Sequence, residues 1–206
     1  MQWTDEFLGY LELEKSLYFS YIPQKEQLPY VVSALQIGRR VAQEAQGLSI
    51  SELCQLHDIQ IIPVKTESAV AQQRIVRAEF EYDKRAGTQK IFLYTAALEE
   101  LVSDTNLTRQ QVEELLLSHE WFHFWETQHG FVYQQLPQLE VPGLFGRKKT
   151  VAVRPLSEIA AHAFAKEMIS LPQLPLIYDI QKQIKEGWLS QGEVEAAYKR
   201  FLPKMG

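Results

Sequence analysis

The feature that most constrains this chain is the H-E-x-x-H pentapeptide at residues 119–123, His119-Glu120-Trp121-Phe122-His123. The flanking residues predict a helix, in which histidines four positions apart lie about 40° apart around the axis and about 6 Å apart along it. Two imidazoles so placed can close on one Zn²⁺ ion at about 2.0–2.1 Å each. Glu120 projects from the neighbouring arc, where it can take a proton from a water molecule that the metal activates.

The segment at residues 107–129 has the pattern of a buried helix. Thr108 and Gln111 stand at capping-box spacing, so we expect Thr108 to be the N-cap. The second half is apolar almost all round, which is typical of a helix buried on most sides. Its ionisable residues share about a third of the circumference: His119, Glu120, His123 and Glu126. A shared metal ion would stabilise this group, because buried ionisable side chains are costly unless paired or bound to metal.

A catalytic zinc site needs a third protein ligand and an open position for water, and three residues are candidates. His129 follows His119 at the metzincin spacing H-E-x-x-H-x-x-G-x-x-H, but Glu126 stands where that motif has glycine. On a continuous helix His129 lies about 15 Å along the axis from His119. A helix C-terminal histidine before Gly130 is therefore the simpler interpretation of His129. Glu126 lies one turn beyond His123, which favours a hydrogen bond to an imidazole N–H over ligation.

The third candidate ligand is Glu158, in a second predicted helix that begins near Ser157 and is stopped by Pro172. A single glutamate on such a helix is commonly a solvated side chain. Here, however, the helix carries three small residues: Ala160, Ala161 and Ala163. We expect these residues to permit close packing against the motif helix, which would bring Glu158 within reach of the metal.

Together, the two helices resemble the ImmA/IrrE family of zincin (gluzincin-like) metallopeptidases. That family follows H-E-x-x-H with a later E-x-x-A-(N/D/H)-x-F-A-x-x-(L/M)-(L/I)-x-P motif. The residues here that match the second motif are Glu158, Ala161, Phe164, Ala165, Met168, Ile169 and Pro172. Residues 48–63 resemble the short helix and first strand that precede the family's catalytic core. The resemblance covers roughly residues 30–172.

The resemblance implies that His119, His123 and Glu158 bind Zn²⁺ and that Glu120 is the general base. His162 stands where the family usually has Asn or Asp, which leaves its role open. The implied fold class is α+β, a minimal zincin-like metallopeptidase fold. In it, a small and mostly antiparallel sheet packs on helices that include the H-E-x-x-H helix, with additional N- and C-terminal helices.

The length of 206 residues and the 46% share of hydrophobic residues suit one domain with a substantial core. We predict a single metallopeptidase domain divided into three parts: N-terminal helices at 1–47, a catalytic core at 48–172 and a C-terminal helical extension at 173–206.

Strands are predicted at residues 59–64, within the alternating stretch 74–82, and at residues 90–94, the last two joined by a hairpin-type connection. An edge strand beside the metal could pair with an extended peptide by strand addition. Residues 90–94 and 74–82 are the two candidates for that edge, and the sequence does not choose between them.

The composition limits partners and location. The net charge of −5 gives no electrostatic footprint for direct nucleic-acid binding. The single cysteine, Cys54, excludes an internal disulfide framework and suits a reducing compartment, and a buried helix cysteine is its simplest interpretation. The start lacks a basic n-region, and no apolar run reaches about 18 residues. We therefore expect a cytoplasmic protein without a membrane partner.

These features predict a zinc-dependent endopeptidase of narrow specificity, in which Zn²⁺ lowers the pKa of a water molecule toward about 7. Glu120 would take the proton and later deliver it to the leaving amine. Side chains that could support a ligand or donate to the developing oxyanion, each with an ordinary structural alternative, are Glu126, His129, Tyr133, Arg154 and His162.

The resemblance implies a peptide or protein substrate, such as a DNA-binding repressor. Two alternatives stay open: an inactive zincin-fold binding or regulatory module, and a metal-dependent hydrolase of a non-peptide substrate. A third alternative is that the H-E-x-x-H motif arose by chance, which we expect in about one of every hundred chains of this size.

Overall fold

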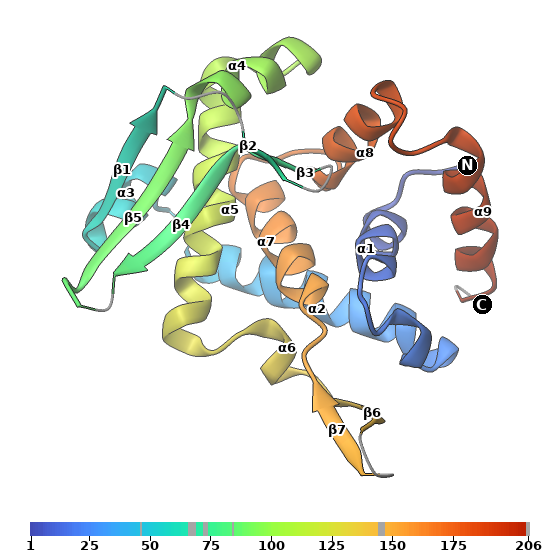
Figure 1. The fold of residues 1–206 in the computed structure, drawn as a ribbon. Coiled ribbons are helices and arrows are strands. Elements are labelled where there is room, and N and C mark those ends of the chain that lie inside the picture. The colour runs from blue at the N-terminus through green and yellow to red at the C-terminus, as the bar shows by residue number, and fades with distance from the viewer. Residues whose placement is uncertain (46, 66–68, 72–73, 84, 144–146, 205–206) are drawn as a thin grey trace.

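Two helices, α5 (Arg109–His129) and α7 (Pro155–Met168), pack against each other at the centre of the fold (Figure 1). The structure, a computed structural model, describes residues 1–45, 47–65, 69–71, 74–83, 85–143 and 147–204. The capping box predicted at the start of α5 is confirmed. The Thr108 side chain accepts a hydrogen bond from the Gln111 N–H, and the Gln111 side chain accepts one from the Thr108 N–H at 2.9 Å.

Helix α2 (Gln24–Glu44) packs on the other side of α7 from α5. At Gly38 the two backbones approach so closely that an added Cβ would lie 2.2 Å from the Ala160 carbonyl oxygen and 2.8 Å from the Ala163 Cβ. Ala160 and Ala163 therefore permit close packing against α2. The contact of α7 with α5 includes aromatic rings, with Phe164 stacked on Trp121 at 5.1 Å between centroids.

The terminal helices share one core with the centre of the chain. α1 (Asp5–Glu14) contacts α2 and α7, and α8 (Leu176–Lys185) and α9 (Gln191–Phe201) contact α1. The buried Asp5 carboxylate accepts hydrogen bonds from Arg39 at 2.8 Å, Lys166 at 2.5 Å and the Leu174 N–H at 3.1 Å. It thereby ties α1 to α2, α7 and the segment before α8.

The remaining helical segments are short: the 3-10 turn Phe19–Tyr21, α3 (Ile50–Leu56), α4 (Thr95–Asp104), α6 (Val132–Gln135) and the 3-10 turn Leu202–Lys204. Among the residues that the structure describes, no helix combines the length and the apolar character needed to cross a membrane.

The main sheet has the strand order β1 (Ile59–Val64), β5 (Thr88–Tyr94), β4 (Ala78–Asp83). β1 runs parallel to β5, with Ile61 opposite Ile91, and β4 runs antiparallel to β5, with Phe80 also opposite Ile91. The sheet is therefore mixed, whereas we had predicted a mostly antiparallel one. A hairpin reverses the chain between β4 and β5, but the longer excursion between β1 and β5 returns it in the original direction.

The strand order also separates the two candidate edges. β5 is the central strand, so residues 90–94 do not form an edge. Residues 74–82 do not form one strand either, because β3 (Arg74–Val76) pairs with β2 (Ala69–Ala71) and only β4 joins the main sheet. Within the described residues, β4 is paired on its β5 side alone and faces α5 (Figure 1).

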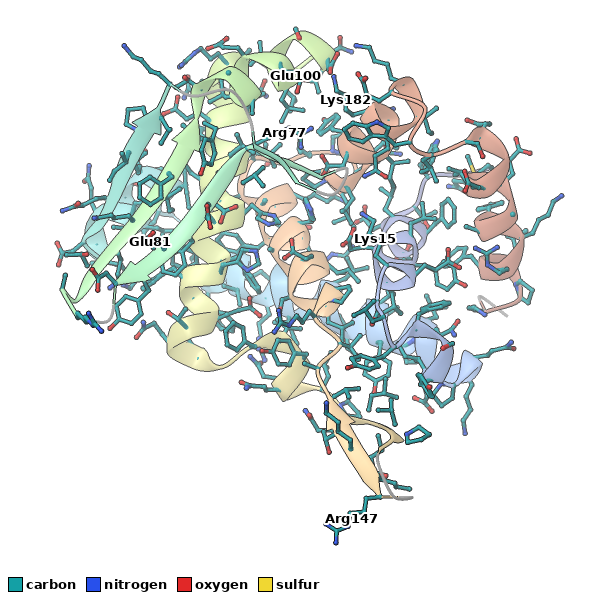
Figure 2. The ribbon with its side chains drawn as sticks, in the orientation of Figure 1. Lys15, Arg77, Glu81, Glu100, Arg147 and Lys182 are labelled. Carbon is teal, nitrogen blue, oxygen red and sulfur yellow. The ribbon has the colours of Figure 1, made fainter. Side chains whose placement is uncertain are left out.

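A second two-stranded ribbon lies between α6 and α7. Strands β6 (Leu139–Pro142) and β7 (Lys148–Val151) pair antiparallel and project away from the body of the fold (Figure 1). Arg147 lies at the outer end of this ribbon, far from the central helices (Figure 2). The ribbon lies in the segment that joins the two motif helices.

The Gly38→Ala substitution should destabilise the protein by about 1–3 kcal/mol, because the new methyl group forces α2 and α7 apart. Urea unfolding followed by circular dichroism would measure the change in the free energy of unfolding. Gly192→Ala in α9 is the matched control, since its added Cβ would have no neighbour closer than Ser190 Oγ at 4.0 Å. Equal stability of Gly38→Ala and wild type would contradict the close approach of α2 and α7.

Cys54 in α3 should be chemically inert while the chain is folded. Its side chain is 1% exposed, and burial raises the pKa of the thiol to about 11. Since the thiolate is the reactive form, we expect Ellman's reagent to modify the folded protein at least about 100-fold more slowly than the urea-unfolded chain. Equal rates in the two states would show that the thiol is accessible.

Candidate metal centre

The second half of α5 directs both motif histidines toward Glu158 on α7. His119 Nε2 lies 3.1 Å from His123 Nε2 and 3.4 Å from Glu158 Oε2. His123 Nε2 lies 3.8 Å from Glu158 Oε1. The histidine pair of α5 and the carboxylate of α7, which the sequence predicted to share a metal ion, thus lie close together.

A fourth residue, His162, belongs to the same cluster. One donor atom each from His119, Glu158 and His162 lie within 4.8 Å of one another, and the rings of the two histidines meet edge to face at 4.5 Å between centroids. His162 follows Glu158 by four positions, so both side chains share one face of α7. His119, Glu158 and His162 are therefore one donor set. The predicted set has His123 in place of His162, and its Nε2 lies 3.1 Å from His119 Nε2 and 3.8 Å from Glu158 Oε1.

Glu126 holds the nitrogen of His123 that faces away from the cluster. Its carboxylate is 1% exposed, and Oε2 accepts a hydrogen bond from His123 Nδ1 at 3.0 Å. Oε1 accepts from the Val132 N–H at 2.8 Å and the Ser157 hydroxyl at 2.6 Å. A carboxylate bonded in this way fixes the orientation of the imidazole ring, so that Nε2 is turned toward His119 and Glu158.

Glu120 lies between the cluster and the open edge of β4. One of its oxygens, Oε2, accepts a hydrogen bond from the Phe80 N–H at 2.9 Å. The Arg77 carbonyl accepts a bond from the Tyr94 N–H of β5 at 3.0 Å. Because backbone groups alternate in direction along an antiparallel strand, the Phe80 N–H points away from β5 and toward α5.

The electrostatics of the cluster favour a bound cation. Burial lowers the pKa of His123, but the hydrogen bond to Glu126 and the charges of Glu158 and Glu120 outweigh it and leave that pKa at about 9. Burial raises the pKa of the Glu158 carboxyl, but the hydrogen bond with His119 and the neighbouring imidazoles hold it well below its usual range. Positive charge is therefore stabilised beside His123.

The chemistry of the donors also fits a divalent metal. Burial and the charge of His119 lower the pKa of His162 to about 3, so its imidazole is neutral at physiological pH. Among the described residues, His119 Nδ1 and His162 Nδ1 are buried without a hydrogen-bond partner. Neutral imidazole nitrogens and carboxylate oxygens are typical ligands of borderline divalent ions. These residues could hold one such ion.

The cluster lines a cleft of about 590 Å³. Its walls come from α1, α4, α5, α7 and α8, from Trp188 and from residues 76–80. The charged groups on these walls include three cations, Lys15, Arg77 and Lys182, which are labelled in Figure 2. Ionisable groups beside an accessible cleft of this size are typical of a binding or catalytic site.

Three other residues that we considered lie elsewhere. His129 Nδ1 is 3.0 Å from the Trp125 carbonyl oxygen, and its ring stacks on Trp125. The rings of Tyr133 and Phe131 stack at 5.2 Å, and Arg154 is the exposed N-cap of α7. None of these three described side chains lines the cleft. For His129 the reason is that α5 continues unbroken to Gly130.

Sequence reasoning missed other groups of the site. Arg77 and Asp179 form an ion pair on the cleft wall although they lie far apart in the chain. Neither the Phe80 amide nor the Ser157 hydroxyl had a sequence signal. Leu116, by contrast, stands four residues before Glu120, so helical periodicity alone could have placed it on the same face.

Fold and site together define an α+β protein with a histidine–glutamate cluster, able to hold a divalent metal ion, on the wall of a cleft. No protein-family model, curated protein or solved structure matches this chain.

Variants of His123 and His162 distinguish the two donor sets. Because Glu126 orients His123, we expect His123→Ala and Glu158→Ala to lose stoichiometric metal, and His162→Ala to retain it. Titration of the metal-free protein with Zn²⁺ or Co²⁺, with elemental analysis after dialysis, would measure this. His57→Ala, at an exposed histidine outside the cluster, is the control. If His123→Ala retained the metal and His162→Ala lost it, the result would favour the set His119, Glu158 and His162.

Proposed function

We propose that this protein is a zinc-dependent endopeptidase of narrow specificity with a zincin-like catalytic core. The observation that carries the proposal is the convergence of His119, His123 and Glu158, with Glu120 beside them at the edge of β4. The resemblance of both motif helices to the ImmA/IrrE metallopeptidases supports the same assignment of roles.

The proposed zinc ligands are His119, His123 and Glu158, and His162 stands beside them. Three nitrogen and oxygen ligands with one open position are the usual arrangement of a catalytic zinc. When bound, Zn²⁺ supplies Lewis acidity, which makes a water molecule more acidic and polarises a substrate carbonyl.

Glu120 is the proposed general base. The Phe80 N–H donates to one carboxylate oxygen at 2.9 Å, and Glu120 lines the cleft. Glu120 accepts a proton from the attacking water as the new C–O bond forms. It then delivers that proton to the amine nitrogen as the C–N bond breaks, so the residue ends in its starting state.

A donor for the developing oxyanion is also required. Of the side chains that we considered for this role, His129, Tyr133 and Arg154 lie outside the cleft, and His162 lines it. We therefore assign this role to His162.

The open edge of β4 supports a peptide as the substrate class. By the alternation that the Arg77 and Phe80 bonds establish, the backbone groups of Ala78, Phe80 and Tyr82 face away from β5. The Phe80 N–H is bonded to Glu120, so the groups offered to a peptide are the Phe80 C=O and those of Ala78 and Tyr82. An extended peptide can add to such an edge by main-chain hydrogen bonds. It would then pass directly beside Glu120. By analogy with the resembling family, a regulatory protein such as a DNA-binding repressor is the proposed physiological substrate.

The Glu120→Gln variant should keep its metal and lose at least about 100-fold in the rate of peptide hydrolysis, because the amide cannot accept the proton. Hydrolysis of a mixed peptide library, followed by mass spectrometry, and elemental analysis of the same samples would measure both quantities. Glu113→Gln, on the same helix outside the cleft, is the matched control.

A wild-type rate of peptide hydrolysis in Glu120→Gln would contradict the role of Glu120 as general base. Metal binding with no hydrolysis of any peptide by the wild type would instead favour a binding module or a hydrolase of another substrate class.

A further inference from the structure

The cleft continues past the metal cluster along the N-terminal half of α5. Leu115 and Leu116 lie one helical turn before His119 and Glu120, on the same face of α5, and both line the cleft. Leu115 is 3% exposed and Leu116 is half-buried. The apolar surface next to Glu120 is therefore supplied mainly by Leu116.

Three further residues that line the same cleft are apolar: Leu101 of α4, Leu176 of α8 and the half-buried Trp188, which follows α8. The backbone N–H of Trp188 donates to the Gln183 carbonyl at 2.8 Å, which helps to fix the loop that carries the indole. An apolar side chain that entered this part of the cleft would contact hydrocarbon.

The cations around this space already have carboxylate partners within the protein. Lys15 pairs with Glu12 at 2.5 Å, and Arg77 pairs with Asp179. Lys182 is surrounded by three carboxylates: those of Glu100 at 2.8 Å, Glu186 at 3.1 Å and Asp104 at 3.2 Å. An acidic side chain that entered would lose its hydration without gaining an unpaired cation from these residues, so the space disfavours an acidic occupant, and the leucines and Trp188 favour an apolar one.

We propose that the leucine–tryptophan pocket, defined by Leu101, Leu115, Leu116, Leu176 and Trp188, binds a bulky uncharged side chain of the peptide substrate beside the scissile bond. The proposal rests on the proposed function. An extended peptide on β4 directs alternate side chains to the same face. Leu116 lies one helical turn before Glu120, so a substrate residue next to the bond that is attacked beside Glu120 would lie close to Leu116. The whole cleft, of about 590 Å³, has room for large side chains such as Leu or Phe beside the metal cluster.

Cleavage specificity gives the first test. The full-length, zinc-loaded protein would be incubated with a mixed peptide library, and cleavage sites would be read by mass spectrometry. We expect Leu, Met or Phe next to the cleaved bond to be preferred at least about tenfold over Ala, Asp or Lys. Leu116→Phe should fill the pocket and reverse the preference toward small residues. Leu56→Phe, at a 66% exposed leucine outside the cleft, should leave it unchanged.

Ligand binding without catalysis gives the second test. The chain has four tryptophans, so ¹⁹F NMR of 5-fluorotryptophan-labelled protein resolves them, and Trp188→Phe assigns the Trp188 signal. Titration of the metal-free protein with N-acetyl-leucine N-methylamide should shift that signal. The alanine, aspartate and lysine analogues should shift it at least about tenfold less at equal concentration. Leu116→Phe should weaken the response to leucine.

The two measurements separate the possible failures. Cleavage without apolar preference, or a Leu116→Phe variant with wild-type specificity, would overturn the pocket assignment while the peptidase stands. A leucine-selective shift of Trp188 without any peptide cleavage would support the pocket and overturn the proposed function. Neither cleavage nor a leucine-selective shift would overturn both. If Leu116→Phe fails to fold, Trp188→Ala provides the second variant, with loss of the preference for bulky residues as the expected result.

Discussion

The site depends on how closely α7 lies between its two neighbouring helices. On one side Gly38 lets the α2 backbone approach Ala160 and Ala163, and on the other Phe164 stacks on Trp121 of α5. This packing sets the position of Glu158 on α7 to within a few ångströms of two imidazoles on α5. A carboxylate so close to His119 and His123 is therefore a consequence of helix packing in the core, and protein interiors pack too densely to allow α7 to drift.

The same helix pair is also joined by a buried hydrogen-bond network. Glu126 bonds to His123 and to the α6 backbone, and the Ser157 hydroxyl of α7 donates to it at 2.6 Å. A buried carboxylate destabilises the fold unless its oxygens accept hydrogen bonds. The three donors to Glu126 belong to α5, α6 and α7, so the hydrogen bonds form only when these helices are assembled. The network therefore couples the orientation of one proposed ligand to the assembly of α5, α6 and α7.

The proposed chemistry combines groups from a rigid helix and from a sheet edge. The Glu120 side chain projects from α5 beside the two histidines, and its carboxylate accepts a hydrogen bond from a backbone N–H of β4. The proposed base, the proposed peptide-binding edge and the leucine–tryptophan pocket are thus neighbours along one cleft. We infer that substrate selection and proton transfer are linked by position along this cleft.

The local features of this site could be predicted from the sequence because they depend on residues close together in the chain. The helix at α5, its Thr108 cap and the shared face of His119, Glu120 and His123 all follow from helical periodicity and capping. The tertiary structure alone decided the rest. The position of His162 beside His119, the choice of β4 as the open edge, the Ser157–Glu126 bond and the Arg77–Asp179 pair join distant segments. The alanines of α7 show why, since Ala160 and Ala163 permit close packing against any helix, and only the glycine at position 38 of α2 determines which one they meet.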